Sequence, residues 1–288
     1  MTTLPRQRQA PSLAKVGAAL RAAPWGAIVA SLILALAAAA AAAPGLLTSG
    51  DPLFADPSQS NLPPSAEHLA GTDLQGRDIY TRIIYGARYS LLIGLGATVV
   101  AALAGTLLGA VAGLGPRAAD QAISRIVDVI CAFPGVLLAL LLITFTGPGI
   151  WNLIAALGLG GLPTYARLLR SQVRLAATSG YVEQAKTYAL GRWRVALRHV
   201  LPNALGPLPI VATIGFGGAI IGSSGLSFLG LGPQPPAAEW GLMVSESRNY
   251  LRNAWWTGVF PGLSITLVVI AATALGRYLQ RRYERRSA

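Results

Sequence analysis

The sequence predicts an all-α integral membrane protein with six transmembrane helices and with both ends of the chain in the cytoplasm. Hydrophobic residues make up 53% of the 288 residues and charged residues make up 12%, about half of the share in a typical soluble domain. Charged residues are absent from five long windows, and a membrane-spanning helix needs about 20 mostly apolar residues. An ordinary soluble fold is excluded, because so few charged side chains could not cover its surface.

The uncharged windows place the helices. They lie between Arg21 and Asp51, Arg88 and Arg117, Asp128 and Arg167, Arg198 and Glu239, and Arg252 and Arg277. The third window is too long for one span and contains the turn-forming triplet Gly147-Pro148-Gly149, so it predicts two helices. Glycines and prolines at positions 230–236 predict an irregular loop after the fifth span. The predicted spans are about 24–43, 89–114, 122–146, 150–169, 204–224 and 256–278.

The first apolar stretch is predicted to be an uncleaved membrane anchor. A basic head followed by alanines that end at Ala43 is also typical of a secretory signal. The run of about 20 apolar residues is longer than the core of a signal peptide, and Pro44 directly after it disfavours cleavage.

The distribution of positive charge predicts the orientation of the helices, because Lys and Arg are retained on the cytoplasmic side. With the N-terminus inside, the inner segments hold 18 of the 23 Lys and Arg residues, and the outer segments hold 7 of the 11 acidic residues. Topology and contact with anionic membrane lipid therefore explain the net charge of +12, and nucleic acid is not an expected partner. The predicted segments are a cytoplasmic N-terminal segment at 1–23, an extracytoplasmic segment at 44–88, a five-helix core at 89–278 with a cytoplasmic loop at 171–203, and a basic cytoplasmic tail at 279–288.

The residue patterns that would support catalysis are missing. A P-loop needs Gly-Lys-Ser/Thr after a glycine-rich turn, but Lys15 and Lys186, the two lysines, each follow an alanine. His68 and His199 are separated by three predicted spans, and no cluster has metal-ligand spacing. We therefore expect a non-catalytic chain without a metal or cofactor of its own. Cys131 is the single cysteine, which excludes an internal disulfide.

Two features stand out within the predicted spans. Asp128 is a charged residue one or two turns from a cytoplasmic helix end, and we expect it to pair with Arg125 on the same helix face. Intramembrane charge is also typical of ion-coupled secondary transporters and channels, so this class is the alternative function, whereas a membrane-embedded enzyme would need clustered His, Asp or Glu. Gly105, Gly109 and Gly113 recur every four residues on one face, which predicts close helix packing.

The inner segment from Tyr181 to Asn203 is polar, basic and compatible with a helix. Small residues and Arg192 follow one edge at helical spacing: Val182, Ala185, Ala189 and Arg192. A short helix of this kind is suited to docking into a groove of another protein. It would equally suit an amphipathic segment on lipid headgroups, and the pattern leaves both interpretations open.

The same segment resembles the inner-loop signature of the membrane permease subunits of ABC importers of the dipeptide, oligopeptide and nickel class. That signature reads Glu-Ala-Ala, three residues, Gly, and a run ending in Leu-Pro, and here Glu183-Gln184-Ala185 and Leu201-Pro202-Asn203 stand at the matching spacing. Gln184 replaces the first alanine, and the glycine falls on Ala189, with Gly191 two residues later.

Other stretches resemble the same family, in particular the C-type partner of its permease pair. They are 68–89 (HLAGTDLQGRDIYTRIIYGARY), 125–134 (RIVDVICAFP), 226–241 (LSFLGLGPQPPAAEWG) and Phe260-Pro261-Gly262. Ser223 and Gly276-Arg277 depart from the family, which often has an acidic residue at the first position and Gly-Asp at the second. The resemblance covers nearly the whole chain beyond about residue 15.

The resemblance implies the type I ABC importer permease fold in a bacterial cytoplasmic (inner) membrane, with 89–278 as the permease core. It implies a heterodimer with a second homologous permease subunit, two cytoplasmic ABC ATPases that bind ATP-Mg, and an extracytoplasmic solute-binding protein. The solute would be a peptide, nickel chelate, opine-type metallophore or glutathione, and its binding residues are not assigned.

The resemblance also implies roles for single residues. The segment 181–203 would be a coupling helix that docks on an ATPase, with Glu183 as a polar anchor, Ala185 and Ala189 permitting close approach, and Arg192, Arg194 and Arg198 available for acidic partners or lipid. The docking positions are Glu183, Gln184, Ala185, Ala189, Gly191, Arg192 and Pro202. Further motif positions have no assigned role: Gly71, Thr72, Asp73, Gly76, Arg77, Asp78 and Asp128.

Overall fold

Helices make up the regular secondary structure of residues 25–188 and 190–287, the part of the chain that the computed structural model describes, apart from one isolated β-bridge between Thr72 and Asp78. The predicted all-α class is confirmed. The predicted cytoplasmic segment 1–23 lies outside the described residues, as does Ala189.

Within the described ranges, four helices are long and apolar enough to cross a membrane. They are α2 (Trp25–Ala42), α3 (Ile79–Leu114), α10 (Leu208–Phe228) and α12 (Trp256–Ser287). A bent pair, α4 (Arg117–Ala132) and α5 (Gly135–Thr146), would supply a fifth span. The remaining predicted span, 150–169, corresponds to α6 (Ile150–Ala177), which is not among the helices that are long and apolar enough to cross a membrane. Six spans therefore stay a prediction.

The prediction of one continuous helix over 122–146 is wrong. The chain breaks at Phe133-Pro134, and the axes of α4 and α5 differ by 91°. Phe133 is extended, with φ −92° and ψ 134°, because the proline ring disfavours a helical conformation in the residue before it. The turn predicted at 147–149 does separate α5 from α6, and Gly147 and Gly149 have positive φ angles of 84° and 144°.

Several helices extend beyond the predicted spans. α3 starts at Ile79 rather than near residue 89, since the Asp78 side chain accepts a hydrogen bond from the Thr81 amide and caps the helix. Its 36 residues correspond to about 54 Å, more than the hydrocarbon thickness of a bilayer. α12 continues through the predicted tail to Ser287. The loop after α10 is irregular as predicted and leads into the short helix α11 (Trp240–Ser247).

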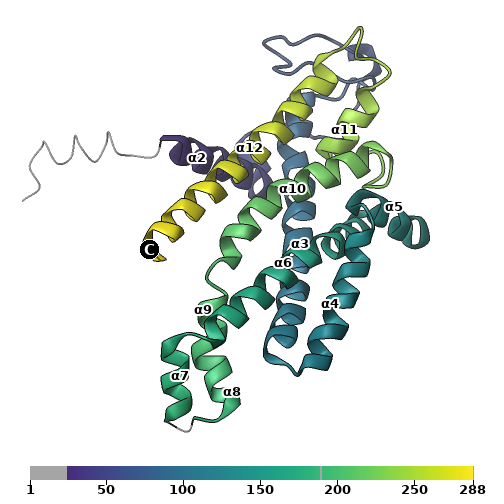
Figure 1. Cartoon of the computed structure of the whole chain (residues 1–288). Helices are drawn as coiled ribbons and strands as arrows, with labels where there is room; N and C mark the ends of the chain where they lie inside the picture. The colour runs from purple at the N-terminus through teal and green to yellow at the C-terminus, as the bar shows by residue number, and fades with distance from the viewer. Residues whose placement is uncertain (1–24, 189, 288) are drawn as a thin grey trace, which may run out of the picture.

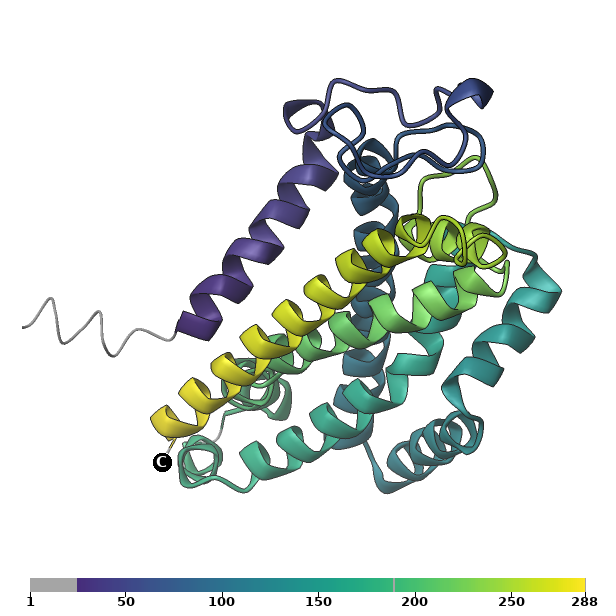
Figure 2. The same cartoon turned by 90° about the horizontal axis from the view of Figure 1, so that it is seen from above.

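The helices form a bundle around α3, which packs on α6, α10 and α2. Figure 1 shows residues 44–78 and α11 at one end of the molecule, and α7 (Gly180–Thr187) and α8 (Arg192–Val195) at the opposite end. We call these the cap end and the hairpin end. The charge pattern predicts the cap end to be extracytoplasmic. Figure 2 shows α2 on the outside of the bundle, where it contacts α3 and α12.

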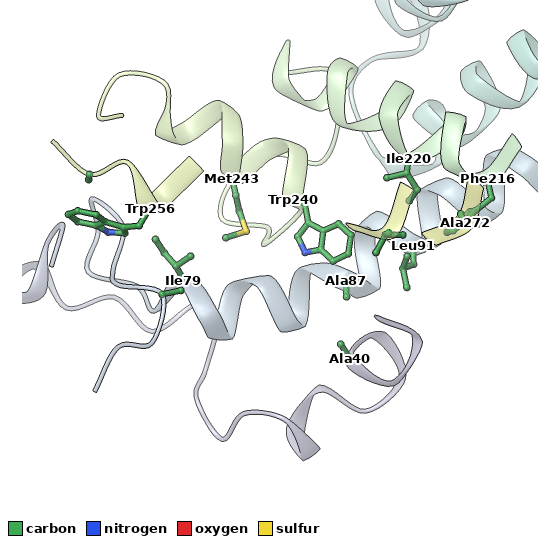
Figure 3. Close-up of a cluster of buried hydrophobic side chains, with 13 residues drawn as sticks. Ala40, Ile79, Ala87, Leu91, Phe216, Ile220, Trp240, Met243, Trp256 and Ala272 are labelled. Atoms are coloured by element: carbon green, nitrogen blue, oxygen red, sulfur yellow. The ribbon is translucent and has the colours of Figure 1, made fainter. Parts of the chain in front are cut away.

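A cluster of buried apolar side chains joins the helices near the cap end (Figure 3). Leu91 of α3 and Ile220 of α10 belong to it, together with Trp240 of α11 and Trp256 of α12. The Trp240 indole donates a hydrogen bond to the Ile83 carbonyl at 2.9 Å. These contacts fix α11 and the start of α12 against α3.

Candidate functional site

The hairpin end contains the segment that was predicted as one short helix over 181–203. Instead, α7 ends at Thr187 and α8 begins after Gly191, its N-cap residue. A π-helical turn at Ala196–Val200 and the short helix α9 (Leu201–Ala204) follow α8 and lead back toward the bundle. We call the segment from α7 to α9 the hairpin (Figure 1).

The inner face of the hairpin packs on α6. Val182 and Ala185 are buried in one cluster with Leu169 and Val173 of α6. Arg192 adds a polar contact, since its Nη2 donates to the Leu114 carbonyl at the end of α3 at 2.6 Å. The small-residue edge of the sequence is thus occupied by the chain's own helix, and Ala185 does not point outward.

The outer face of the hairpin is free and partly aromatic. Glu183 is exposed, and Tyr188, Trp193 and Leu197 are 81%, 74% and 61% exposed. The other exposed positions with an expected docking role are Gln184, Gly191, Arg192, Arg194, Arg198 and Pro202. Large apolar side chains exposed on a polar segment are typical of a surface that binds another protein. Sequence reasoning missed the two aromatic residues, although Tyr188 and Trp193 flank the break between the helices.

The three predicted packing glycines face α6. A β-carbon at Gly105 would lie 2.5 Å from the Leu162 carbonyl oxygen, and one at Gly109 would lie 2.5 Å from the Ala166 carbonyl oxygen. At Gly113 the neighbour is the Val173 side chain, at 2.6 Å. α3 and α6 therefore approach at a distance that excludes any side chain at these positions.

At the cap end, the motif around 71–78 builds a tight loop before α3. Gly71 and Gly76 both have a φ of +73°, which favours glycine. Arg77 Nε donates to Asp73 Oδ2 at 2.6 Å. The Thr72 hydroxyl donates to the Gln59 carbonyl, and the Trp256 indole donates to the Thr72 carbonyl. The motif thereby ties the predicted extracytoplasmic segment to α12.

Arg82 and Glu246 were missed by sequence reasoning. Arg82 is 1% exposed, and its Nη2 donates to Glu246 Oε2 of α11 at 3.1 Å. Arg77 Nη2 donates to the same oxygen at 3.4 Å. No local pattern relates residues that are 164 positions apart, so only the fold brings them together.

Glu239 is a second buried acid near the cap end that the sequence did not single out. It is 0% exposed, caps α11 through the Leu242 amide at 2.8 Å, and accepts from the Ser90 hydroxyl at 3.2 Å. Burial raises the pKa of the Glu239 carboxyl above its ordinary value.

The expected pairing of Asp128 with Arg125 is wrong. Asp128 Oδ1 instead accepts from Arg167 Nη2 of α6 at 2.9 Å, and both side chains are more than half exposed. Asp120, about two turns earlier in the same helix, forms ion pairs with Arg170 and Arg174. These pairs connect α4 to the arginine-rich half of α6, because their partners face each other across the two helices.

Comparison with known proteins shows which family the chain resembles in sequence and in fold. The family described as "binding-protein-dependent transport system inner membrane component" matches residues 105–287. The chain is 44% identical over 231 residues to the dipeptide transport system permease protein DppC of Alkalihalophilus pseudofirmus, covering 80% of this chain and 76% of that protein. It is 38% identical over 223 residues to the glutathione transport system permease protein GsiD of Pectobacterium atrosepticum, covering 77% and 74%. A solved chain of the MetNI methionine ABC transporter, in an inward-facing conformation, is similar in fold, with a TM-score of 0.58 at 18% identity, over 70% of this chain and 96% of that one.

Proposed function

Because this chain belongs to the family of binding-protein-dependent transport system inner membrane components, we propose that it forms half of the translocation pathway of an ATP-driven importer of small peptides. The chain is a multi-pass inner-membrane permease subunit. The other half of the pathway would come from a second homologous permease subunit. Two cytoplasmic ABC ATPases would supply the energy by binding and hydrolysing ATP-Mg, and an extracytoplasmic binding protein would deliver the solute.

The outer face of the hairpin is the observation that carries the ATPase-docking part of the proposal. Tyr188 and Trp193 expose large aromatic surfaces on the hairpin, and Glu183 of α7 is also exposed. Aromatic residues in the centre of an interface commonly contribute much of its binding energy. Residues 165–200, which include most of the hairpin, hold 7 of the 18 Lys and Arg residues expected on the cytoplasmic side, more than any other inner segment. This face would therefore receive the ATPase.

The inner face of the hairpin supports a mechanical link to the bundle. Val182 and Ala185 pack on α6, and Arg192 holds the Leu114 carbonyl of α3. A displacement of the hairpin by a closing ATPase dimer would move α3 and α6 with it, since packed elements shift as rigid bodies. Differential contact with the two ATPase states would thus change which side of the membrane the pathway faces.

The solute proposed for this importer follows from the relatives. One carries a name for dipeptide transport and another for glutathione transport. Both kinds of solute contain peptide bonds and free carboxylates. A small peptide delivered by an extracytoplasmic binding protein is therefore the solute class that these relatives support.

The proposal is tested with the assembled importer in lipid nanodiscs. The chain is co-expressed with its second permease and the ATPases, and ATP hydrolysis is measured with and without peptide-loaded binding protein. We expect Glu183→Arg and Trp193→Ala each to lower the stimulated rate about tenfold, the effect of losing one charge-assisted or anchoring contact.

A matched control reverses the same charge at the other end of the molecule. Glu67 is exposed in the loop before α3, and Glu67→Arg is expected to leave ATPase assembly unchanged. Purification of the wild-type chain as a stable homo-oligomer that transports peptide without ATP would contradict the proposal.

A further inference from the structure

A cavity of about 430 Å³ lies at the cap end, between the loop before α3 and α11. This volume falls in the range of small-molecule sites, which is about 300–1,000 Å³. Part of its lining is apolar, from Ile79 of α3 and Met243 of α11, which Figure 3 shows on facing elements. The loop side of the cavity precedes residue 105, where the family match begins.

The charged lining of the cavity carries an excess of positive charge. Two carboxylates, Asp73 and Glu246, face three guanidinium groups, those of Arg77, Arg82 and Arg248. Arg77 and Arg82 are buried and share the two carboxylates in ion pairs. Arg248 is exposed, and its side chain forms no ion pair with any residue that the structure describes. One cation at the cavity is therefore without a counter-charge.

Hydrogen-bonding capacity at the cavity is also unused. Nη1 of Arg82 and Oδ1 of Asn61 are buried without a hydrogen-bond partner, and both residues line the cavity. Glu246 uses Oε2 for both arginines, and its side chain is 28% exposed. Buried polar groups without partners are unusual in folded proteins, so this lining is incompletely satisfied as it stands.

We infer that this cavity binds the free carboxylate of a small zwitterionic solute, with Arg248 as the contacting cation. The apolar lining, from Ile79 and Met243, accommodates a short side chain of the solute. The inference rests on the proposed function, since a small peptide carries both charged groups. An acidic side chain of the docked binding protein is the competing source of a carboxylate.

The test uses the assembled importer in nanodiscs without its binding protein, so that only the membrane complex can bind the probe. The probes are dialanine and its C-terminal amide, which lacks the carboxylate, and saturation-transfer NMR gives an apparent Kd. We expect the amide to bind about tenfold more weakly, because one charge-assisted hydrogen bond is lost. Arg248→Gln should weaken dialanine binding by a similar factor and leave binding of the amide unchanged.

Arg252→Gln is the matched control, because Arg252 is exposed four residues after Arg248 and does not line the cavity. This variant should bind dialanine like the wild type, and thermal unfolding should show that all the complexes are equally folded. Equal affinity for dialanine and the amide would overturn the inference. So would an Arg248→Gln variant that binds dialanine normally but associates less well with the binding protein.

Failure of the inference and failure of the proposed function are distinguishable. A complex that couples ATP hydrolysis to peptide uptake but does not discriminate dialanine from its amide keeps the proposed function and removes the cavity site. A complex without coupled uptake removes the proposed function, whichever probe binds.

Discussion

Glu246 Oε2 lies 3.1 Å from Arg82 Nη2, and this contact joins α11 to the first turn of α3. The arginine is 1% exposed, so water does not compensate its charge. Arg77 donates to the same carboxylate oxygen, and one acid therefore serves two buried cations. The position of α11 therefore depends on the Glu246 side chain as well as on the apolar cluster that contains Trp240 and Met243.

Replacement of Glu246 by Gln should destabilise the cap end. Removing one partner of a buried ion pair costs about 3–5 kcal/mol, and we expect about 3 kcal/mol because the Glu246 side chain is 28% exposed. Thermal unfolding of the assembled complex measures the effect. Glu67→Gln, at an exposed acid in the loop before α3, should change the stability by less than about 0.5 kcal/mol. An equal loss in both variants would mean that the pair does not hold α11.

Gly109→Ala should disrupt the contact between α3 and α6. The added β-carbon would meet the Ala166 carbonyl oxygen at 2.5 Å, and a backbone atom cannot move aside as a side chain can. Overpacking of this kind costs about 1–3 kcal/mol. Gly218→Ala in α10 is the matched control, since nothing lies within 4 Å of its β-carbon position, and it should be neutral or slightly stabilising. The unfolding temperatures of the two purified variants test this prediction. A lower unfolding temperature for Gly218→Ala alone would contradict the close contact assigned to Gly109.

The positions of the apolar helices could be predicted from sequence, because a long uncharged window has few solutions in a membrane protein. The break between α4 and α5 was also encoded locally. Phe133-Pro134 is a helix-ending pair, but the surrounding apolar run concealed it. The start of α3 was placed about ten residues late because Arg82 and Arg88 interrupt the uncharged window, whereas the Asp78 cap determines where the helix begins.

The contacts that build the two ends could not be predicted in the same way. Val182 and Ala185 form a small-residue edge that suits any close neighbour, and the sequence does not reveal that the neighbour is α6. The Arg82–Glu246 pair links segments that are far apart in sequence, so no spacing rule reports it. Charge counts predicted which segments share a side of the membrane, and packing then decided which side chains meet.

Arg192→Ala should loosen the hairpin without removing its outer surface. The Arg192 guanidinium donates to the Leu114 carbonyl at 2.6 Å, and losing one such charged hydrogen bond costs about 1.5–3 kcal/mol. We discount this to about 1 kcal/mol because Arg192 is exposed. Hydrogen exchange of the amides in 192–200 should become about fivefold faster. Arg194→Ala, which removes a neighbouring exposed arginine, should leave exchange unchanged. Identical exchange in both variants would show that the contact does not anchor α8.

Glu239 should make stability depend on pH in the direction opposite to that of an ordinary paired acid. Burial raises the pKa of its carboxyl above the usual 4.5, so the folded chain binds this proton more tightly than the unfolded chain does. Above the folded-state pKa the buried carboxylate is charged, and its burial lowers the stability of the folded chain. This loss of stability disappears as the pH falls through that pKa toward 4.5 and the carboxyl becomes protonated. Glu239→Gln cannot titrate at this position. The difference in unfolding temperature, wild type minus Glu239→Gln, should therefore rise as the pH is lowered from 8 toward 5. A difference that is constant over this range would mean that Glu239 ionises in the folded chain as freely as in the unfolded one.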